Sequence, residues 1–563
     1  MPDAGTGSSL RDKLDRPGAF VVAAEIVTSR GLLSADGGRK ALELASELAE
    51  YPRIDVLSIT DNPGGHAMFS PDALGTDLIS RGQEVIIHLA CKDWNRNALE
   101  SRGWQLSSQG FHNVLALSGD YPVMGHKGLA APVFDIDSVG LLSLFSEMNA
   151  GLRDERKPDT RLDRTDFFLG CVVTNHKRYE REVMPQYFKL RKKARAGARF
   201  VINQIGYDVR KDDELLRWIR RDGLDLRALA NVFLLSRTSA RAFRRGVIPG
   251  VVVTDELLRW IRADGLELHA LANVYLLSRP AARAFHQGKI PGVVVTDRLL
   301  ELAERHGASP DKGRAFFVDL AAKHFAVARG LGFGGVYLGG HTPAATFGEI
   351  VDLASGFAPD DWRTFVPELR YPFDDEFYFF EPDPDTGLSS DAVNGAYLES
   401  KRRRRTDLRV PFTYRVSRRM HDAIFAPEAP LHPTGQALYR GLEKGPHVAR
   451  LAAHAAEQAA KVALFGCLDC GDCSLPEIAY VCPESQCAKN QRNGPCGGTR
   501  EGLCEVYDSE CIWSQAYERL KAYGEEESML DGPVVVKDNA LAGTSAWANA
   551  FLGRDHVGKE GAA

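Results

Sequence analysis

Residues 20–27 read Phe-Val-Val-Ala-Ala-Glu-Ile-Val, and residues 84–90 read Glu-Val-Ile-Ile-His-Leu-Ala. Both are short apolar runs with one polar side chain near the end, and longer helical patterns separate them from further runs of the same kind. These runs are Ile54–Ile59, Val114–Leu117, Phe167–Val173, Phe200–Gln204, Asn231–Leu235 and Gly335–Leu338. Parallel strands joined by crossover helices have this pattern. Eight such units predict an α/β fold, a closed (β/α)8 TIM-type barrel over residues 18–357.

Polar residues stand at the carboxyl-terminal ends of the predicted strands. In enzymes with a (β/α)8 barrel, this end of the strands carries the active site. The side chains at these positions are therefore candidates for a functional centre: Glu25, Thr60, His88, Asp120, Asn175 and Gln204.

A tandem repeat interrupts the regular alternation. Residues 213–254 and 255–296 are identical at 33 of 42 positions. Two copies are too few for a solenoid and indicate a duplicated helix–strand unit. The duplication gives nine candidate strands for eight places, so we expect one copy to lie outside the closed sheet. We favour the second copy as the barrel strand, because it runs directly into the following helices.

Eight of the ten cysteines lie between residues 467 and 511, beginning with C-x2-C-x2-C. Disulfides are disfavoured, because no secretory signal pattern precedes the barrel and we expect a cytoplasmic chain with reduced thiols. Two four-cysteine zinc sites would use all eight thiolates. The opening spacing is also similar to the first ligands of a ferredoxin-type iron–sulfur site. The candidate metal ligands are Cys467, Cys470, Cys473, Cys482, Cys487, Cys496, Cys504 and Cys511.

Composition and charge restrict the remaining possibilities. The 563 residues are 44% hydrophobic with a formal net charge of −5, and no long apolar run predicts a membrane span. The overall charge does not indicate nucleic-acid binding, and the basic run 401–405 is typical of a solvated linker. Around the barrel we expect a flexible N-terminus (1–17), a connecting arm (358–443), a cysteine-rich metal-binding domain (444–555) and a flexible tail (556–563).

Two groups of segments carry a family resemblance. Ala24-Glu25, Ser58-Ile-Thr60, Ile87–Cys91, Asn113–Asp120 and Ala196–Gln204 resemble, in order and spacing, the strand ends of 5,10-methylenetetrahydrofolate reductases. The second group resembles the small cysteine-rich subunit of that reductase in acetogens, here fused to the catalytic part. Its segments are Cys467-Leu-Asp-Cys470-Gly-Asp-Cys473, Cys482-Pro483, Asn493-Gly-Pro-Cys496-Gly-Gly498 and Cys511-Ile-Trp513.

The resemblance implies an FMN enzyme that moves hydride between the flavin and the one-carbon unit of tetrahydrofolate. Glu25 would be the general acid that opens methylene-folate to an iminium, and a strand-end ion pair is its structural alternative. Asp120 would lie near both flavin and pterin, with a turn residue as the alternative, and Gln204 would bind folate. The FMN contacts implied are Thr60, His88, Gly119, Asp120 and Lys193. For His88, a buried and hydrogen-bonded histidine is an equal alternative.

The chain departs from the family at two positions. Ser118 replaces an arginine that helps to bind FMN, so phosphate binding would depend on Lys193 and backbone amides near Gly339 and Gly340. Asp61 replaces an aromatic residue in the region where nicotinamide stacks. We therefore expect electrons to pass between FMN and a partner protein through [4Fe–4S] clusters. One alternative is that the C-terminal domain is a zinc docking module and the barrel uses NAD(P)H directly. Another is a non-catalytic folate-binding subunit. For the protein as a whole, we expect a homo-oligomer.

Overall fold

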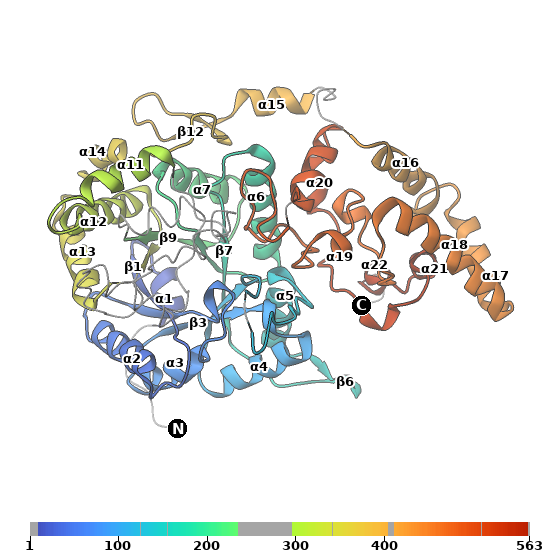
Figure 1. Ribbon diagram of the computed structural model, residues 1–563, viewed down its shortest axis with the longest axis horizontal. Coiled ribbons are helices and arrows are strands. Elements are labelled where there is room, and N and C mark those ends of the chain that lie inside the picture. Colours follow the sequence, from blue (N-terminus) through green and yellow to red (C-terminus); the bar gives the residue numbers. More distant parts are fainter. Residues whose placement is uncertain are drawn as a thin grey trace.

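The computed structural model describes residues 9–123, 125–154, 156–234, 296–340, 342–402, 410–507 and 509–560. It contains the predicted closed barrel of eight parallel strands (Figure 1). Neighbouring strands follow one another in sequence order around the barrel, and the last strand pairs with the first. The strands are β1 (Val21–Ile26), β2 (Val56–Ile59), β3 (Val85–Ala90), β4 (Asn113–Leu117), β7 (Phe168–Val173), β8 (Phe200–Asn203), β9 (Arg227–Phe233) and β10 (Gly335–Gly339).

The first copy of the tandem repeat supplies the seventh barrel strand. Its strand β9 pairs with β8 on one side and β10 on the other, and the sheet closes with eight strands. Our preference for the second copy was therefore wrong. The direct connection of the second copy to the following helices did not decide the choice. The first copy comes soon after β8, contains most of helix α7 (Val209–Arg221), and its strand β9 completes the sheet. The second copy, apart from Thr296, lies outside the described residues.

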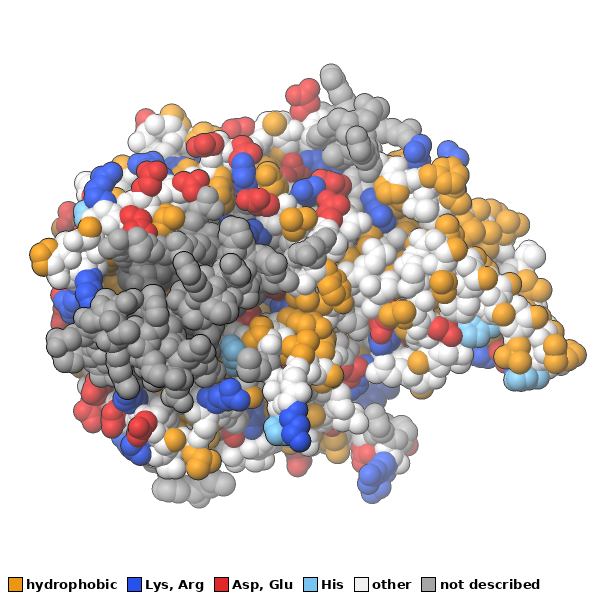
Figure 2. All heavy atoms as spheres, viewed as in Figure 1, with side chains coloured by type: hydrophobic (Ala, Val, Ile, Leu, Met, Phe, Trp, Pro, Cys, Tyr) orange, Lys and Arg blue, Asp and Glu red, His pale blue; other side chains and the backbone are white. Residues whose placement is uncertain are grey.

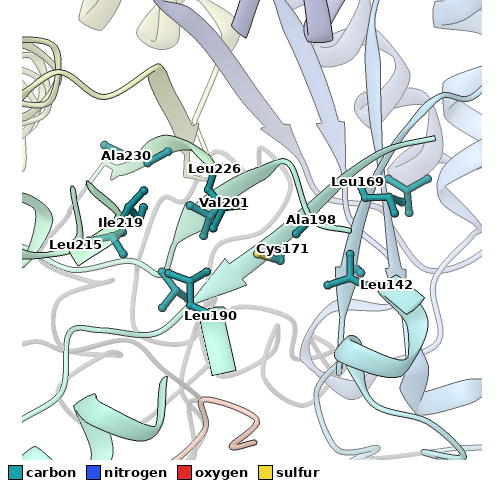
Figure 3. Close-up of a cluster of buried hydrophobic side chains, with 14 of the residues drawn as sticks. Leu142, Leu169, Cys171, Leu190, Ala198, Val201, Leu215, Ile219, Leu226 and Ala230 are labelled. Atoms are coloured by element: carbon teal, nitrogen blue, oxygen red, sulfur yellow. The ribbon is translucent and has the colours of Figure 1, made fainter. Parts of the chain in front are cut away.

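Helices cover the outside of the barrel, and the alternation of side chains along each strand creates two apolar layers. The outer layer lies between strands and helices. Figure 3 shows Cys171 of β7 and Val201 of β8 beside Leu190 of α6 in this layer. The covering helices are α2 (Asp36–Ala49), α3 (Pro71–Ser80), α4 (Arg96–Ser108), α5 (Ser138–Ala150), α6 (Glu180–Arg195), α7 (Val209–Arg221), α11 (Asp297–His306), α12 (Arg314–Leu331) and α13 (Ala344–Gly356).

The inner layer fills the barrel and is closed at its amino-terminal end by helix α1 (Leu10–Asp15). Leu10 and Leu14 are buried against inward-facing strand residues such as Phe200. Ser9 caps this helix by accepting a hydrogen bond from the backbone of Asp12. Residues 9–15 therefore form an anchored helix, contrary to the expected flexible N-terminus, because its two leucines bury apolar area under the barrel.

The segment after the barrel has two parts. Residues 358–402 pack on the barrel, where Arg210 and Lys211 of α7 donate hydrogen bonds to the carbonyl oxygens of Phe380 and Phe377. The part from residue 410 onward lies beside the barrel, with α20 (Ile512–Lys521) next to α6 (Figure 1). The first part contains α14 (Trp362–Phe365), η3 (Val366–Leu369), β11 (Phe380–Pro382), β12 (Ser389–Val393) and α15 (Gly395–Arg402).

The C-terminal part is a loop-rich unit whose last helix is attached to the rest. His556 of α22 hydrogen-bonds Asp472 and Glu477, so residues 556–560 are anchored instead of forming the flexible tail expected from the sequence. Within the described ranges, no helix combines the length and apolar character that a bilayer crossing requires. The elements are α16 (Phe412–Met420), η4 (His421–Phe425), α17 (His432–Lys444), α18 (His447–Phe465), η5 (Pro476–Ile478), α19 (Pro483–Gln486), α20 (Ile512–Lys521), η6 (Glu526–Leu530), η7 (Asn539–Leu541), α21 (Ala546–Phe551) and α22 (His556–Glu560).

Candidate active site

A cavity of about 300 Å³ lies at the carboxyl-terminal mouth of the barrel. The structure brings together at this cavity seven residues that the sequence nominated for catalysis, folate or FMN, namely Glu25, Thr60, His88, Gly119, Asp120, Lys193 and Gln204. Asp61 lines it as well. Asn175 instead donates a hydrogen bond to the carbonyl oxygen of Lys211, and Gly339 and Gly340 are not among the lining residues.

Glu25 points into the barrel mouth because it shares the inward-facing side of β1 with Val21 and Ala23. Tyr337 of β10 donates a hydrogen bond to its carboxylate over 2.8 Å. The same hydroxyl lies 3.3 Å from His88 Nε2, which in turn lies 2.8 Å from Ser58 Oγ. The candidate acid therefore belongs to a buried hydrogen-bonded network of polar side chains from four strands.

Burial controls the protonation of the ionisable side chains at the barrel mouth. It raises the pKa of the Glu25 carboxyl above its ordinary value, and the hydrogen bond from Tyr337 opposes that rise only in part. Burial lowers the pKa of His88 to about 3, so its imidazole is neutral at pH 7. It also raises the pKa of Asp61 to about 6, with the hydrogen bond from the Ala90 amide acting in the opposite direction. A carboxyl group with a raised pKa can deliver a proton near neutral pH.

Loop contacts position the other predicted residues. The backbone amide of Gly64 donates to Asp120 Oδ2 over 2.8 Å, which ties the loop after β2 to the loop after β4. Thr60 Oγ1 accepts from the amide of Thr28. Lys193 of α6 is buried and donates to the carbonyl oxygen of Val172. Burial lowers the pKa of Lys193 to about 8, which leaves its ammonium group mostly charged at pH 7.

The cysteine-rich region supplies one wall of the cavity. Lys489 extends its ammonium group to the carbonyl oxygen of Gly119 at 2.8 Å and pairs with Glu505. Ser118, at the position where the resemblance expects arginine, donates to Gln491 Oε1 at 2.9 Å. Cys496 and Gly497 also line the cavity. A cation from the C-terminal region therefore lies beside the position of the missing arginine.

The eight clustered cysteines separate into two sets of four around two small cavities. None of the chain's ten cysteines forms a disulfide. Among the described residues, no group of three or more His, Cys, Asp or Glu side chains is arranged to hold a single metal ion. The first set is Cys467, Cys470, Cys473 and Cys482, and the second set is Cys487, Cys496, Cys504 and Cys511.

Backbone amides point at several of these sulfur atoms. Asp469 donates to Cys467, Gly498 to Cys496 and Val506 to Cys504, each at 3.4–3.5 Å. Such bonds stabilise thiolates and tune the sulfur ligands of a metal centre. Cys496 belongs to the second set and also faces the barrel mouth, so this set is the one next to the active-site cavity.

Sequence reasoning missed several residues of the site, among them Tyr337, Asn231, Gln186 and Lys489. Tyr337 and Asn231 stand on inward-facing positions of β10 and β9, so strand alternation contained a signal for both. Gln186 lies on α6 and Lys489 lies 369 positions after Asp120 in the sequence. The participation of Lys489 depends on how the C-terminal region docks, for which the sequence holds no local signal.

Comparison with known families agrees with the geometry. The family model described as "Methylenetetrahydrofolate reductase" matches residues 18–263, and the one described as "Methylene-tetrahydrofolate reductase C terminal" matches residues 447–539, which hold all eight clustered cysteines. The chain belongs to the methylenetetrahydrofolate reductase family. It is a methylenetetrahydrofolate reductase-like oxidoreductase with a fused C-terminal domain. The first match ends inside the second repeat copy, so it includes β9 but not β10.

Three solved structures show a distant resemblance to this reductase-like chain. An uncharacterized protein from Clostridium thermocellum that binds two copies of 5-methyl-5,6,7,8-tetrahydrofolic acid has 12% identity and a TM-score of 0.38, over 62% of this chain and 98% of that one. A 2,3-dimethylmalate lyase has 14% identity and a TM-score of 0.25, and the match covers 53% of this chain and 96% of that one. A xylanase A mutant from P fluorescens subsp. cellulosa has 12% identity and a TM-score of 0.31, and the match covers 60% of this chain and 98% of that one. No curated protein matches the chain.

Proposed function

We propose that this protein interconverts 5,10-methylenetetrahydrofolate and 5-methyltetrahydrofolate in the cytoplasm, with FMN in the barrel-mouth cavity and electrons relayed through the C-terminal domain. The observation that carries the proposal is the convergence of Glu25, Asp120, Lys193 and Gln204 on one cavity. These residues offer an acid, a fixed carboxylate, a cation and an amide, which are the groups that a folate and a flavin phosphate require.

The cavity suits a polar cofactor. Asn231 Oδ1 and Gln186 Nε2 are buried with no hydrogen-bond partner among the residues that the structure describes, and both residues line the cavity. Such atoms are costly unless a ligand satisfies them. Lys193 would hold the phosphate group, and Thr60, Gly119 and Asp120 would contact the ring system. When bound, FMN supplies a carrier that accepts and returns hydride.

Glu25 performs the proton step in this proposal. Methylene-folate accepts hydride only after one ring nitrogen is protonated and the five-membered ring opens. Because burial holds Glu25 protonated at higher pH than an exposed glutamate, it can deliver that proton. In the reverse direction the same carboxylate takes the proton back, since a catalyst acts in both directions.

Tyr337→Phe tests the link between Tyr337 and Glu25. The change removes a donor that stabilises the charged carboxylate, so the pKa of Glu25 rises further. A general acid works only while protonated, and the alkaline limb of the kcat/KM profile should therefore move to higher pH by about 1–2 units, as expected for one hydrogen bond to a charged group. Tyr187→Phe is the control, because Tyr187 donates to Glu214 outside the cavity. If the Tyr337→Phe and Tyr187→Phe variants had the same kcat/KM pH profile, Tyr337 would not control the pKa of Glu25.

The two cysteine sets are proposed to hold one [4Fe–4S] cluster each. A zinc ion draws four sulfur atoms to about 2.3 Å from one centre. A [4Fe–4S] cluster also takes four cysteine ligands, which matches the four cysteines lining each cavity, and the C-x2-C-x2-C spacing that opens the first set is similar to a ferredoxin run. The second set, whose Cys496 borders the barrel mouth, would be nearer to FMN, and the first set would face the partner protein.

The direct test is a visible spectrum of anaerobically purified protein, with iron, sulfide, zinc and flavin measured on the same sample. Flavin bands with about eight irons and eight sulfides per chain are expected, since two four-cysteine sets hold two [4Fe–4S] clusters. A yellow, iron-free protein with about two zinc ions would make the C-terminal domain structural and direct attention to NAD(P)H as the donor. A colourless protein would leave only a folate-binding role.

A further inference from the structure

Helix α18 buries its charged residues and exposes its aliphatic ones. Glu457 is fully buried and Lys461 is 5% exposed. On the opposite face Val448 is 74% exposed, and Leu451 and Val462 are each 53% exposed. A surface helix normally has the opposite orientation, with its apolar stripe facing the core.

The interior of the C-terminal domain explains the orientation. Glu457 accepts hydrogen bonds from the hydroxyl of Ser545 and the amide of Trp547 at the start of α21, and it pairs with Lys461 over 3.2 Å. Lys461 also lines the cavity of the first cysteine set. The polar face of α18 is therefore required inside the domain, and rotation of the helix to bury its aliphatic face would break these contacts.

The exposed face of α18 continues over neighbouring helices. Figure 2 shows hydrophobic side chains gathered over α16, α17 and α18 at one end of the molecule. Large exposed apolar patches on soluble proteins mark interaction sites. We call this surface the α18 face; its large exposed side chains are Phe412, Val416, Leu438, Val448, Leu451 and Val462.

We propose that a second copy of the chain covers the α18 face, with the two α18 helices antiparallel about a two-fold axis between Ala455 and Ala456. In this register Val448 meets Ala463 of the other copy, and Leu451 meets Ala460. Large side chains thus face small ones at each end, and the centre is alanine on alanine, which permits close packing.

Charge and size agree with a second copy. Positions 451, 452, 455, 456, 459, 460, 462 and 463 of α18 are exposed and uncharged, so two copies do not repel each other there. The 19 residues of α18 span about 28 Å. With α17 in contact alongside, a face about 20 Å wide would bury roughly 1,100 Å² in total, which clears the roughly 1,000 Å² expected of a biological interface. Interfaces between permanently associated copies are more hydrophobic than transient ones, which agrees with the uncharged, aliphatic face of α18.

Ala455→Arg tests this interface. The residue is exposed, so the fold should persist, and two arginines would meet at the two-fold axis. Ala396→Arg is the matched control, an exposed alanine in the separate helix α15. In sedimentation velocity of the anaerobic full-length protein, wild type and A396R should sediment as dimers of a 61.9 kDa chain, and A455R as a monomer with unchanged iron and flavin content.

A second variant tests the register. Ala455→Cys should form an interchain disulfide under mild oxidation, identified by mass spectrometry of the 455-containing peptide, because the axis places the two copies of this residue together. A monomeric wild-type protein would overturn the proposal, and so would a dimer that A455R leaves intact. Monomeric protein whose α18 face binds an acidic redox carrier would assign the surface to that carrier instead. None of these outcomes depends on FMN or folate activity.

Discussion

Glu25→Gln is expected to reduce methylene-folate turnover by about 10²–10⁴-fold, the usual contribution of general acid catalysis. The amide keeps the size of the side chain and still accepts the hydrogen bond from Tyr337, but it has no proton to donate. Flavin binding and flavin reduction should be unchanged, because neither needs that proton. Single-turnover assays separate the steps, with flavin reduced first by a small dye and then mixed with folate.

Glu84→Gln is the matched control for this variant. Glu84 stands at the opposite end of the barrel, where it accepts hydrogen bonds from the amide of Leu10 and from Asn113, and an amide oxygen can accept both. Its turnover should equal that of the wild type. If Glu25→Gln retained full turnover with folate, the proton would have to come from another group, and Asp61, with a pKa of about 6 in the same cavity, would be the next candidate.

The barrel and most of its mouth were predictable because their signals are local. Apolar runs of four to eight residues with helices between them define parallel strands, and the two-residue period places Glu25, His88 and Gln204 on the inner face. Nothing but the resemblance pointed to Lys193, which lies on a helix, and it too reached the cavity. Local pattern and family resemblance therefore agreed on the catalytic end of the barrel.

Contacts distant in sequence were beyond sequence reasoning. The two repeat copies differ at only nine positions, so their own residues could not decide which copy joins the sheet. From the sequence, Ser118 indicated the loss of an FMN-binding arginine. In the structure, Lys489 of the C-terminal domain places a cation beside that position. The division of eight cysteines into two sets likewise follows from the folding of the loops between residues 467 and 511, and spacing alone left it open.

Cys470→Ser is expected to abolish folate turnover driven by a reduced iron–sulfur carrier protein and to remove about four irons per chain. Cys470 lines the cavity of the first set, which does not border the barrel mouth. Electrons that arrive from a partner would have to pass this set, whereas a small dye can reduce flavin in the barrel directly. Dye-driven turnover should therefore remain within about twofold of wild type, since no residue of the barrel mouth changes.

Cys171→Ala provides the control for cysteine loss itself. Cys171 is buried in β7, far in sequence from both sets, and lines neither of their cavities. The iron content and the carrier-driven turnover of the Cys171→Ala variant should match those of the wild type. If Cys470→Ser lost dye-driven turnover in a folded protein, the first set would support the barrel and not the electron path. If it kept carrier-driven turnover, electrons would enter without passing the first set, and the second set beside Cys496 would be the point of entry.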